Sequence, residues 1–319
     1  MTSQVHPIVV AGVDGSTQSF VALDLAADEA VRRHQPLRVV AAFLWPALAP
    51  VAQIADAGFT DDMLTAAHRM LEEAVDRIRH ARPGLEVTST VVLGSAAGVL
   101  ITESQRASVI VVGNRGHGGF ASLLAGSVAT QLAAHAHCPV IIVRPDADGG
   151  SSPADTALSR AGVTASPVVV GIDAEERTEA AIAFAFEEAA NRGVSLTAVR
   201  IWAEPLSSGP DQFKPVAYEY DAARKTAARQ LAESLAGYQE KYPDVTVDRE
   251  LIHGHDPAHE LRIVSAEAGL IVVGSRGRGE LAGLVLGSIG QTLVHQARCP
   301  VAIVHPAAAS TELAGAGRP

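Results

Sequence analysis

Two stretches of the chain carry glycines and a serine at a spacing that is typical of a phosphate-binding loop. Both read Gly-x2-Gly-x9-Gly-Ser, and they begin at Gly113 and Gly274. Glycines let backbone N–H groups approach an anion closely, and the helix that follows adds the positive end of its dipole. Ser127 and Ser288 each add a hydroxyl donor, and Arg115 adds a charged one. A single loop of this kind is often only a tight turn, but its duplication without a gap favours nucleotide-phosphate binding.

Each stretch is preceded in the chain by an aspartate at the end of an apolar run, Asp14 and Asp173. In a doubly wound sheet, ligands bind beyond the carboxyl ends of the strands, so we expect Asp14 to accept hydrogen bonds from a base or ribose. Ser16 or Thr17 is placed to cap the next helix. The second copy differs, because Asp173 is followed by Ala174-Glu175-Glu176. That change removes a hydroxyl and adds two carboxylates, which oppose a polyphosphate.

The two loops belong to an internal repeat. Gly113 to Pro145 matches Gly274 to Pro306 at a constant offset of 161, and 16 of those 33 positions are identical. The repeat and the composition between its copies predict four segments. They are a first domain over residues 1–145, a linker over 146–166, a second domain over 167–306 and a disordered tail over 307–319.

Within each copy, short β-branched runs alternate with longer amphipathic stretches, which predicts five strands and four helices. The predicted strands are 8–13, 37–44, 86–93, 109–113 and 140–143, then 168–173, 195–202, 245–252, 270–274 and 301–304. The predicted helices of the first copy are 20–34, 59–82, 97–106 and 122–135, and those of the second follow in the same order. Nearly continuous apolar strands between helices indicate an α/β protein of two tandem doubly wound domains, each with a parallel sheet covered on both faces.

Composition excludes several classes of function. With 48% hydrophobic and 19% charged residues among 319, the chain is too apolar for disorder. It has no run near the roughly 20 apolar residues that a membrane helix needs. A net charge of −10 argues against a nucleic-acid surface, and scattered basic residues argue against a basic membrane anchor. No signal peptide is visible, so we expect a cytoplasmic protein.

Cysteine and histidine point to structural roles. Cys138 and Cys299 each precede Pro-Val and have no CxxC partner, so we expect buried thiols. Residues 253–259 include three histidines at a spacing that suits a metal, but Asp256-Pro257 within them is typical of a helix N-cap and first position. We therefore predict no metal site.

These motifs resemble the universal stress protein family, in the tandem-domain form common in actinobacteria. The resemblance covers nearly the whole chain and rests on Asp14-Gly-Ser-Thr, Val111-Val-Gly-Asn-Arg-Gly-His-Gly-Gly, Leu124-Ala-Gly-Ser-Val and Cys138-Pro-Val. It implies a five-stranded parallel sheet of order 3-2-1-4-5 in each domain and, in the branch with this glycine spacing, binding of ATP, with or without Mg²⁺. It also implies pairing of domains through their last strands and a homodimer of whole chains.

The resemblance implies nucleotide contacts in both copies, including the backbone near Ala42 at the end of the second strand. For Glu204 an ordinary exposed loop carboxylate is an equal alternative. The first-copy positions are Gly12, Asp14, Ser16, Ala42, Gly113, Arg115, Gly116, His117, Gly118, Gly119, Gly126, Ser127 and Val128. The second-copy positions are Gly171, Asp173, Glu204, Gly274, Arg276, Gly277, Arg278, Gly279, Gly287, Ser288 and Ile289.

The sequence favours a nucleotide-dependent regulatory protein in stress response or growth control, acting on an unknown protein partner. Two alternatives stay open. One is a slow ATPase or nucleotidyl-transfer enzyme, although the chain has no Walker A motif and no nucleophile elbow to carry such chemistry. The other is a nucleotide-free interaction scaffold, which Glu175 and Glu176 favour in the second copy. We assign no catalytic residue.

Overall fold

A computed structural model describes residues 7–43, 57–116, 126–144, 166–173, 178–203, 216–275 and 286–306. The strands of the first copy are β1 (Ile8–Gly12), β2 (Leu37–Phe43), β3 (Val87–Leu93), β4 (Ala107–Gly113) and β5 (Val140–Val143). Those of the second are β6 (Val168–Gly171), β7 (Leu196–Trp202), β8 (Val247–His253), β9 (Leu270–Gly274) and β10 (Val301–Val304). The helices are α1 (Thr17–Arg33), α3 (Ala57–Ala81), α4 (Ala96–Glu103), α5 (Ser127–His135), α7 (Glu179–Arg192), α8 (Val216–Lys241), α9 (Pro257–Val264) and α10 (Ser288–Gln296). The α/β prediction is confirmed.

All the strands lie in one sheet, in the order β3-β2-β1-β4-β5-β10-β9-β6-β7-β8. Each half therefore has its strands in the order 3-2-1-4-5, counted from the start of its copy. Neighbours within a half are parallel, whereas β5 and β10 pair antiparallel, with Ile141 opposite Ala302. The two predicted five-stranded sheets are thus joined into one. The joining strands are buried at all four of their residues, so each would otherwise be an exposed apolar edge.

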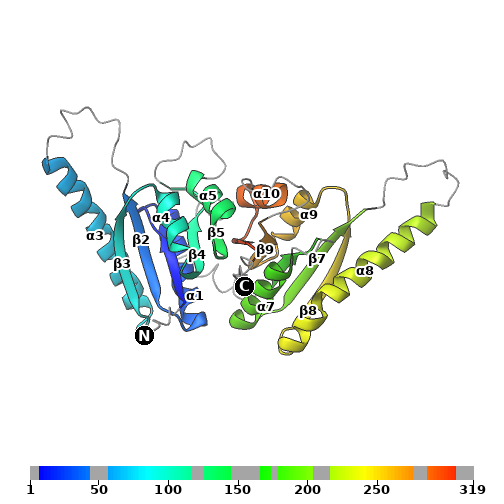
Figure 1. Cartoon of the computed structure of the whole chain (residues 1–319). Helices are drawn as coiled ribbons and strands as arrows, with labels where there is room; N and C mark the ends of the chain where they lie inside the picture. Colours follow the sequence, from blue (N-terminus) through cyan, green and yellow to red (C-terminus); the bar gives the residue numbers. More distant parts are fainter. Residues whose placement is uncertain are drawn as a thin grey trace, which may run out of the picture.

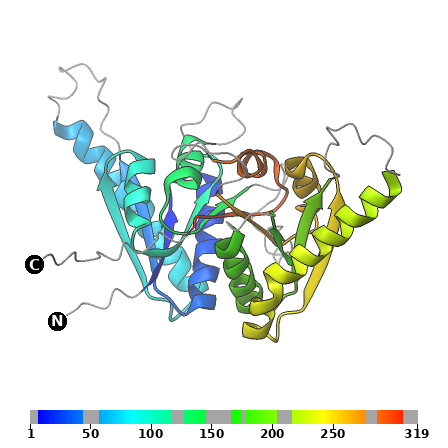
Figure 2. The same cartoon turned by 45° about the vertical axis from the view of Figure 1, so that its right-hand side comes forward.

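Helices cover both faces of this sheet, and one apolar layer on each face runs through both copies. Helices α1, α3, α7 and α8 contribute to one layer, and α4, α5, α9 and α10 to the other. The long helices α3 and α8 lie at opposite ends of the molecule, while α5 and α10 face each other in the middle (Figures 1 and 2). The core is therefore continuous across the join between the copies.

A buried ring of four charged side chains joins α1 of the first copy to α7 of the second. Arg33 reaches Glu188 at 2.5 Å, and Arg192 reaches Glu29 at 2.5 Å. Arg192 also pairs with Glu188 at 2.9 Å, one turn away on its own helix. Both glutamate side chains are fully buried, and neither arginine side chain is more than 10% exposed. The charges are compensated by one another and by the flanking Arg32 and Glu187, because water has little access to them.

Burial raises the pKa of Glu188, and the neighbouring Glu29 carboxylate raises it further. Burial also opposes ionisation of Glu29, but the charges of Arg192 and Arg32 outweigh that effect and lower its pKa. Burial likewise opposes the charge on Arg192, while Glu29 and Glu188 favour it and raise its pKa. The arginines thus favour the ionised form of both carboxylates, against the effect of burial.

Replacing Arg192 with methionine should strongly destabilise the protein, because it removes a cation that contacts both buried carboxylates, Glu29 and Glu188. Removing one partner of a buried ion pair costs about 3–5 kcal/mol, and we expect a loss of that size in urea denaturation followed by circular dichroism. The control is Arg229→Met on α8, which removes an exposed pair with Glu233. That variant should stay within about 0.5 kcal/mol of the parent. Equal losses in the two variants would contradict a buried ring.

The two cysteines should be inert in the folded protein. Cys138 and Cys299 are each 6% exposed, and burial raises the pKa of both thiols to about 12. At pH 8 only about one thiol in ten thousand is then the reactive thiolate. We expect no reaction of the native protein with a chromogenic disulfide reagent at pH 8, and reaction of both thiols after unfolding in guanidinium. Rapid reaction of either thiol in the native state would show that the core is open there.

Candidate functional site

The carboxyl end of β1 leads directly into a hydrogen-bonded turn that begins α1. Asp14 Oδ1 accepts hydrogen bonds from the backbone N–H of Ser16 at 3.0 Å and from its hydroxyl at 2.6 Å. The Ser16 oxygen in turn accepts the N–H of Ser19 at 3.2 Å, so Ser16 is the N-cap of α1, as the sequence predicts. Gly15, which lies between Asp14 and Ser16, has a φ of +84°, a conformation that residues with a side chain rarely adopt. Asp14 is thereby held exposed at the edge of the sheet.

The second glycine of the first loop lies against this aspartate. A Cβ built on Gly116 would stand 2.1 Å from Asp14 Oδ2, so a side chain at this position requires the Asp14 carboxylate to move. The first glycine is also close-packed, since a Cβ on Gly113 would lie 3.2 Å from the backbone of Gln18 in α1. The glycines therefore bring the chain after β4 against the carboxylate and the first turn of α1.

Asn114, the residue after the first of these glycines, holds the loop to the helix that follows the loop. The carbonyl of Asn114 accepts the N–H of Gly126, the N-cap of α5, at 2.7 Å, and its own N–H donates to Val143 at 2.8 Å. In the second copy, Ser275 accepts from Gly287 at 3.2 Å in the same way. The position makes the same backbone contact in both copies, and this contact is compatible with either asparagine or serine.

The serines of the two motifs open helices at the expected places. Ser127 is the first residue of α5 and Ser288 the first of α10, and both are exposed. Val128 and Ile289 follow as half-buried residues that pack on the core. The hydroxyls and the first N–H groups of both helices thus face outward, beside the glycines that cap them.

Ala42 lies near the end of β2, opposite Val92 of β3. The ladder between β1 and β2 stops at Gly12 and Val40, so Ala42 extends beyond the end of β1 on the side toward Asp14. This is the position at which the sequence expects a backbone contact to a base.

Two predicted contact residues face the core. A Cβ on Gly12 would lie 2.8 Å from Leu100 Cδ1, and one on Gly171 would lie 2.9 Å from Leu261 Cδ1. Gly12 lets α4 pack closely on the sheet, and Gly171 does the same for α9. Helix packing therefore explains why these two positions carry no side chain.

The two copies differ where the first helix begins. In the second copy, Asp173 ends the described segment, and the N-cap of α7, Thr178, makes no side-chain hydrogen bond to its helix. The first turn of α7 carries Glu179, whereas that of α1 has no acidic residue. The arrangement of Asp14 and Ser16 therefore has no counterpart among the described residues of the second copy. Several predicted positions lie outside the described residues: His117, Gly118, Gly119, Glu204, Arg276, Gly277, Arg278 and Gly279.

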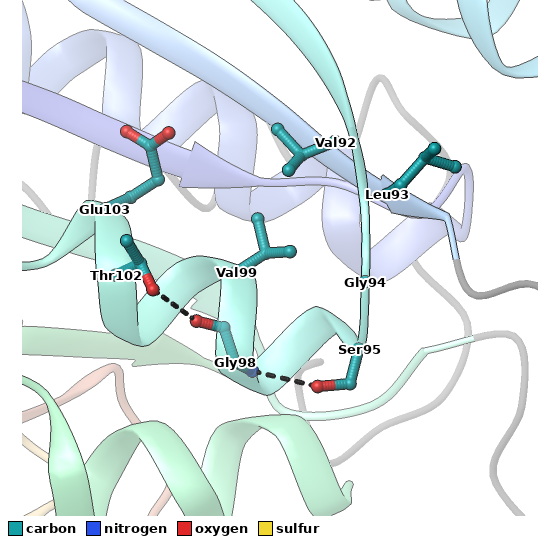
Figure 3. Close-up of a pocket in the computed structure, with 8 residues that line it drawn as sticks. All are labelled: Val92, Leu93, Gly94, Ser95, Gly98, Val99, Thr102 and Glu103. Carbon is teal, nitrogen blue, oxygen red and sulfur yellow. Dashed lines mark hydrogen bonds between the residues drawn. The ribbon is translucent and has the colours of Figure 1, made fainter.

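The hollow of about 390 Å³ between the end of β3 and α4 contains none of the predicted contact residues (Figure 3). Its polar side chains are already engaged. Ser95 accepts from the N–H of Gly98 at 3.3 Å, Thr102 donates to the carbonyl of Gly98 at 3.0 Å, and Glu103 pairs with Arg38 at 3.0 Å. This hollow therefore offers few free polar groups to a ligand.

The histidine-rich stretch forms a helix start, as the sequence predicts. Asp256 accepts from the N–H groups of Ala258 and His259 at 3.1 Å each, with Pro257 at the first position of α9. Within the described part of the chain, no three His, Cys, Asp or Glu side chains come together as a metal site. None of the described helices combines the length and apolar character needed to cross a membrane.

Sequence reasoning missed the ring of Glu29, Arg33, Glu188 and Arg192. The available signal was a Glu and an Arg four residues apart at the same place in both copies, at an offset of 159. That signal predicts an ordinary pair on one helix and does not reveal that the pairs exchange partners across the copies.

Known proteins match this chain over almost all of its length. The profile of the universal stress protein family matches residues 6–144 and 164–305. Universal stress protein Rv2005c of Mycobacterium tuberculosis is 36% identical over 303 residues, covering 92% of this chain and 96% of its own. Rv2623 of the same organism is 34% identical, with 92% and 95% covered.

Solved structures show the same fold at low sequence identity. A universal stress protein of Archaeoglobus fulgidus has a TM-score of 0.66 at 20% identity, covering 94% of this chain and 98% of its own. A putative universal stress protein of Pseudomonas aeruginosa has a TM-score of 0.57 at 14% identity, with 95% and 94% covered. The duplicated glycine motif, the sheet and these matches agree: the chain belongs to the universal stress protein family, as a tandem pair of its domains.

Proposed function

We propose that this chain binds ATP beyond the carboxyl ends of β1 and β4, and acts as a nucleotide-dependent regulatory protein. The observation that carries the proposal is the close approach of Gly116 to Asp14. A Cβ added to Gly116 would lie 2.1 Å from an oxygen of the Asp14 carboxylate. A carboxylate and a glycine loop at one sheet edge provide an acceptor for ribose or base next to a backbone surface for phosphate.

Several residues of the first copy fit this ligand. Asp14 accepts hydrogen bonds from the nucleoside, and the backbone of Ala42 faces the base beyond the end of β1. Ser127 and the first N–H groups of α5 donate to phosphate, aided by the helix dipole. The exposed Arg115 supplies positive charge beside Gly116. ATP brings a charged polyphosphate and an adenosine, and its occupancy is the signal; we assign no bond-breaking step to the protein.

The second copy offers a weaker version of this site in our proposal. It keeps Asp173, Gly274 and the clasp between Ser275 and Gly287. Among its described residues, the N-cap Thr178 makes no side-chain hydrogen bond to α7, and Glu179 lies in the first turn of that helix. Negative charge at a helix N-terminus competes with phosphate for the positive end of the dipole. We expect the second copy to bind ATP less tightly.

Assembly belongs to the same proposal. The pairing of β5 with β10 already makes one chain a pseudo-dimer of two domains. We propose that whole chains form a further homodimer and that nucleotide occupancy changes binding of a regulatory protein partner. Size-exclusion chromatography with light scattering, with and without ATP, measures the first of these.

Gly116→Ala should remove ATP from the first copy. The added methyl group must displace the Asp14 carboxylate, whose other oxygen is held by Ser16. Nucleotide released from the denatured protein, counted by ultraviolet absorbance and mass spectrometry, should fall by about one per chain.

Gly237→Ala is the matched control, since a Cβ at that helical position meets nothing within 4 Å. It should keep the parental ATP count and add up to about 1 kcal/mol of stability. An unchanged ATP count in Gly116→Ala would exclude the proposed position of the site. No ATP in the parent protein, together with no binding in calorimetry, would favour an interaction scaffold.

A further inference from the structure

The join between the copies has a second set of contacts, on the face opposite the charged ring. Arg144, which follows β5, donates from Nη1 to the carbonyl of Val294 in the last turn of α10 at 2.8 Å. His305, which follows β10, contacts the carbonyl of Ala133 in α5 at 3.1 Å through Nε2. Each copy thus extends one basic side chain to the last helix of the other, α10 or α5, and these two helices face each other in Figure 1.

The corner around Arg144 gathers several further polar groups. Asn114 lies beside it on the neighbouring strand, because its N–H donates to Val143 at 2.8 Å. Arg115 follows Asn114, and His295 follows Val294 on the helix that Arg144 contacts. The corner is therefore built from the ends of β4 and β5 in the first copy and from α10 in the second.

Three buried atoms of this corner have no hydrogen-bond partner: Asn114 Oδ1, Arg144 Nε and His295 Nδ1. Asn114 is only 1% exposed, so its amide cannot be satisfied by bulk water. Leaving a buried polar group unpaired is costly, and such groups are rare in folded proteins. Three such atoms on neighbouring residues favour binding of a polar species at this corner.

The charge of the corner is positive. Burial lowers the pKa of Arg144, and the nearby charge of Arg115 lowers it further. Burial and the charge of Arg144 likewise lower the pKa of His295. Among the described residues, no ion pair joins Arg144 or Arg115 to a carboxylate, whereas the arginines of the ring are all paired with glutamates. Within the described part of the chain, the charge at this corner therefore favours an anion.

We propose that Asn114, Arg115, Arg144 and His295 form a binding site for a phosphate-type oxyanion at the join between the copies. The fixed guanidinium of Arg144 presents Nε to the anion, and the imidazole of His295 donates from Nδ1. The amide of Asn114 donates from Nδ2 when it is turned about its axis. The second copy contributes His295 to a site that is otherwise built by the first.

The opposite corner provides natural substitutions at the same positions. Its residues are Ser275, His305 and Ala134, in place of Asn114, Arg144 and His295. Since His305 keeps the contact to the opposite helix, Arg144→His is a change that the fold already tolerates in its other half. His295→Ala is tolerated on the same grounds.

Binding of inorganic phosphate to the full chain, measured by calorimetry at constant ionic strength, tests the proposal directly. We expect saturable binding to the parent protein and at least a tenfold weaker affinity in Arg144→His and in His295→Ala. Arg229→Gln on the exposed face of α8 changes the net charge by the same amount as loss of one arginine and should leave the affinity unchanged. Absence of saturable binding, or equal affinity in all variants, would overturn the site.

The oxyanion is either free phosphate or the terminal phosphoryl group of a bound nucleotide, and only the second source rests on the proposed function. A phosphoryl source predicts that phosphate competes with ATP and that Arg144→His weakens ATP at least tenfold while AMP is unaffected. A free-phosphate source predicts that phosphate and ATP bind together and that the variant leaves ATP affinity unchanged. If the chain binds no ATP at all, the phosphate titration still decides the proposal.

Discussion

The antiparallel pairing of β5 with β10 is the contact on which the arrangement of the whole molecule depends. All four residues of each strand are buried, and an unpaired apolar edge of this kind would offer open N–H and C=O groups to any other chain. Once the two edges pair, the sheet becomes continuous, and an apolar layer runs through both copies on each face. The edges that remain, β3 and β8, are mostly exposed or half-buried, as solvent-facing edges must be.

The same pairing brings corresponding helices of the two copies together beside the join. Side chains that occur in both copies must therefore be complementary to one another. A Glu and an Arg four residues apart on a helix meet this requirement, because the Glu of one copy contacts the Arg of the other. Apolar side chains would bring equal or greater stability, since the desolvation of buried charges offsets much of their attraction. Buried charges, however, penalise every alignment in which one of them lacks a partner. We infer that the ring helps to select the alignment of the two copies.

Local structure was predictable from the sequence because it depends on periodicity and on capping groups. The predicted bounds of β5 and β10 agree with the structure, and Ser16 and Asp256 cap their helices as expected. Contacts between distant segments were not predictable in the same way. Gly12 resembles part of a ligand loop, because nothing near it in the sequence indicates that Leu100 packs on it. Glu29 and Arg33 resemble surface residues of an amphipathic helix until the second copy covers them.

At the ends of the strands, the two copies keep the same backbone contacts while their side chains differ. The ring keeps the same residue types in both copies, because a change in one would leave a buried charge in the other. At the strand ends, Asn114 corresponds to Ser275, yet both keep the same backbone clasp. Arg144 corresponds to His305, yet both contact the opposite helix. The charge and the hydrogen-bonding groups of these side chains differ between the copies. The ends of the strands are therefore chemically different in the two copies, although the fold is the same.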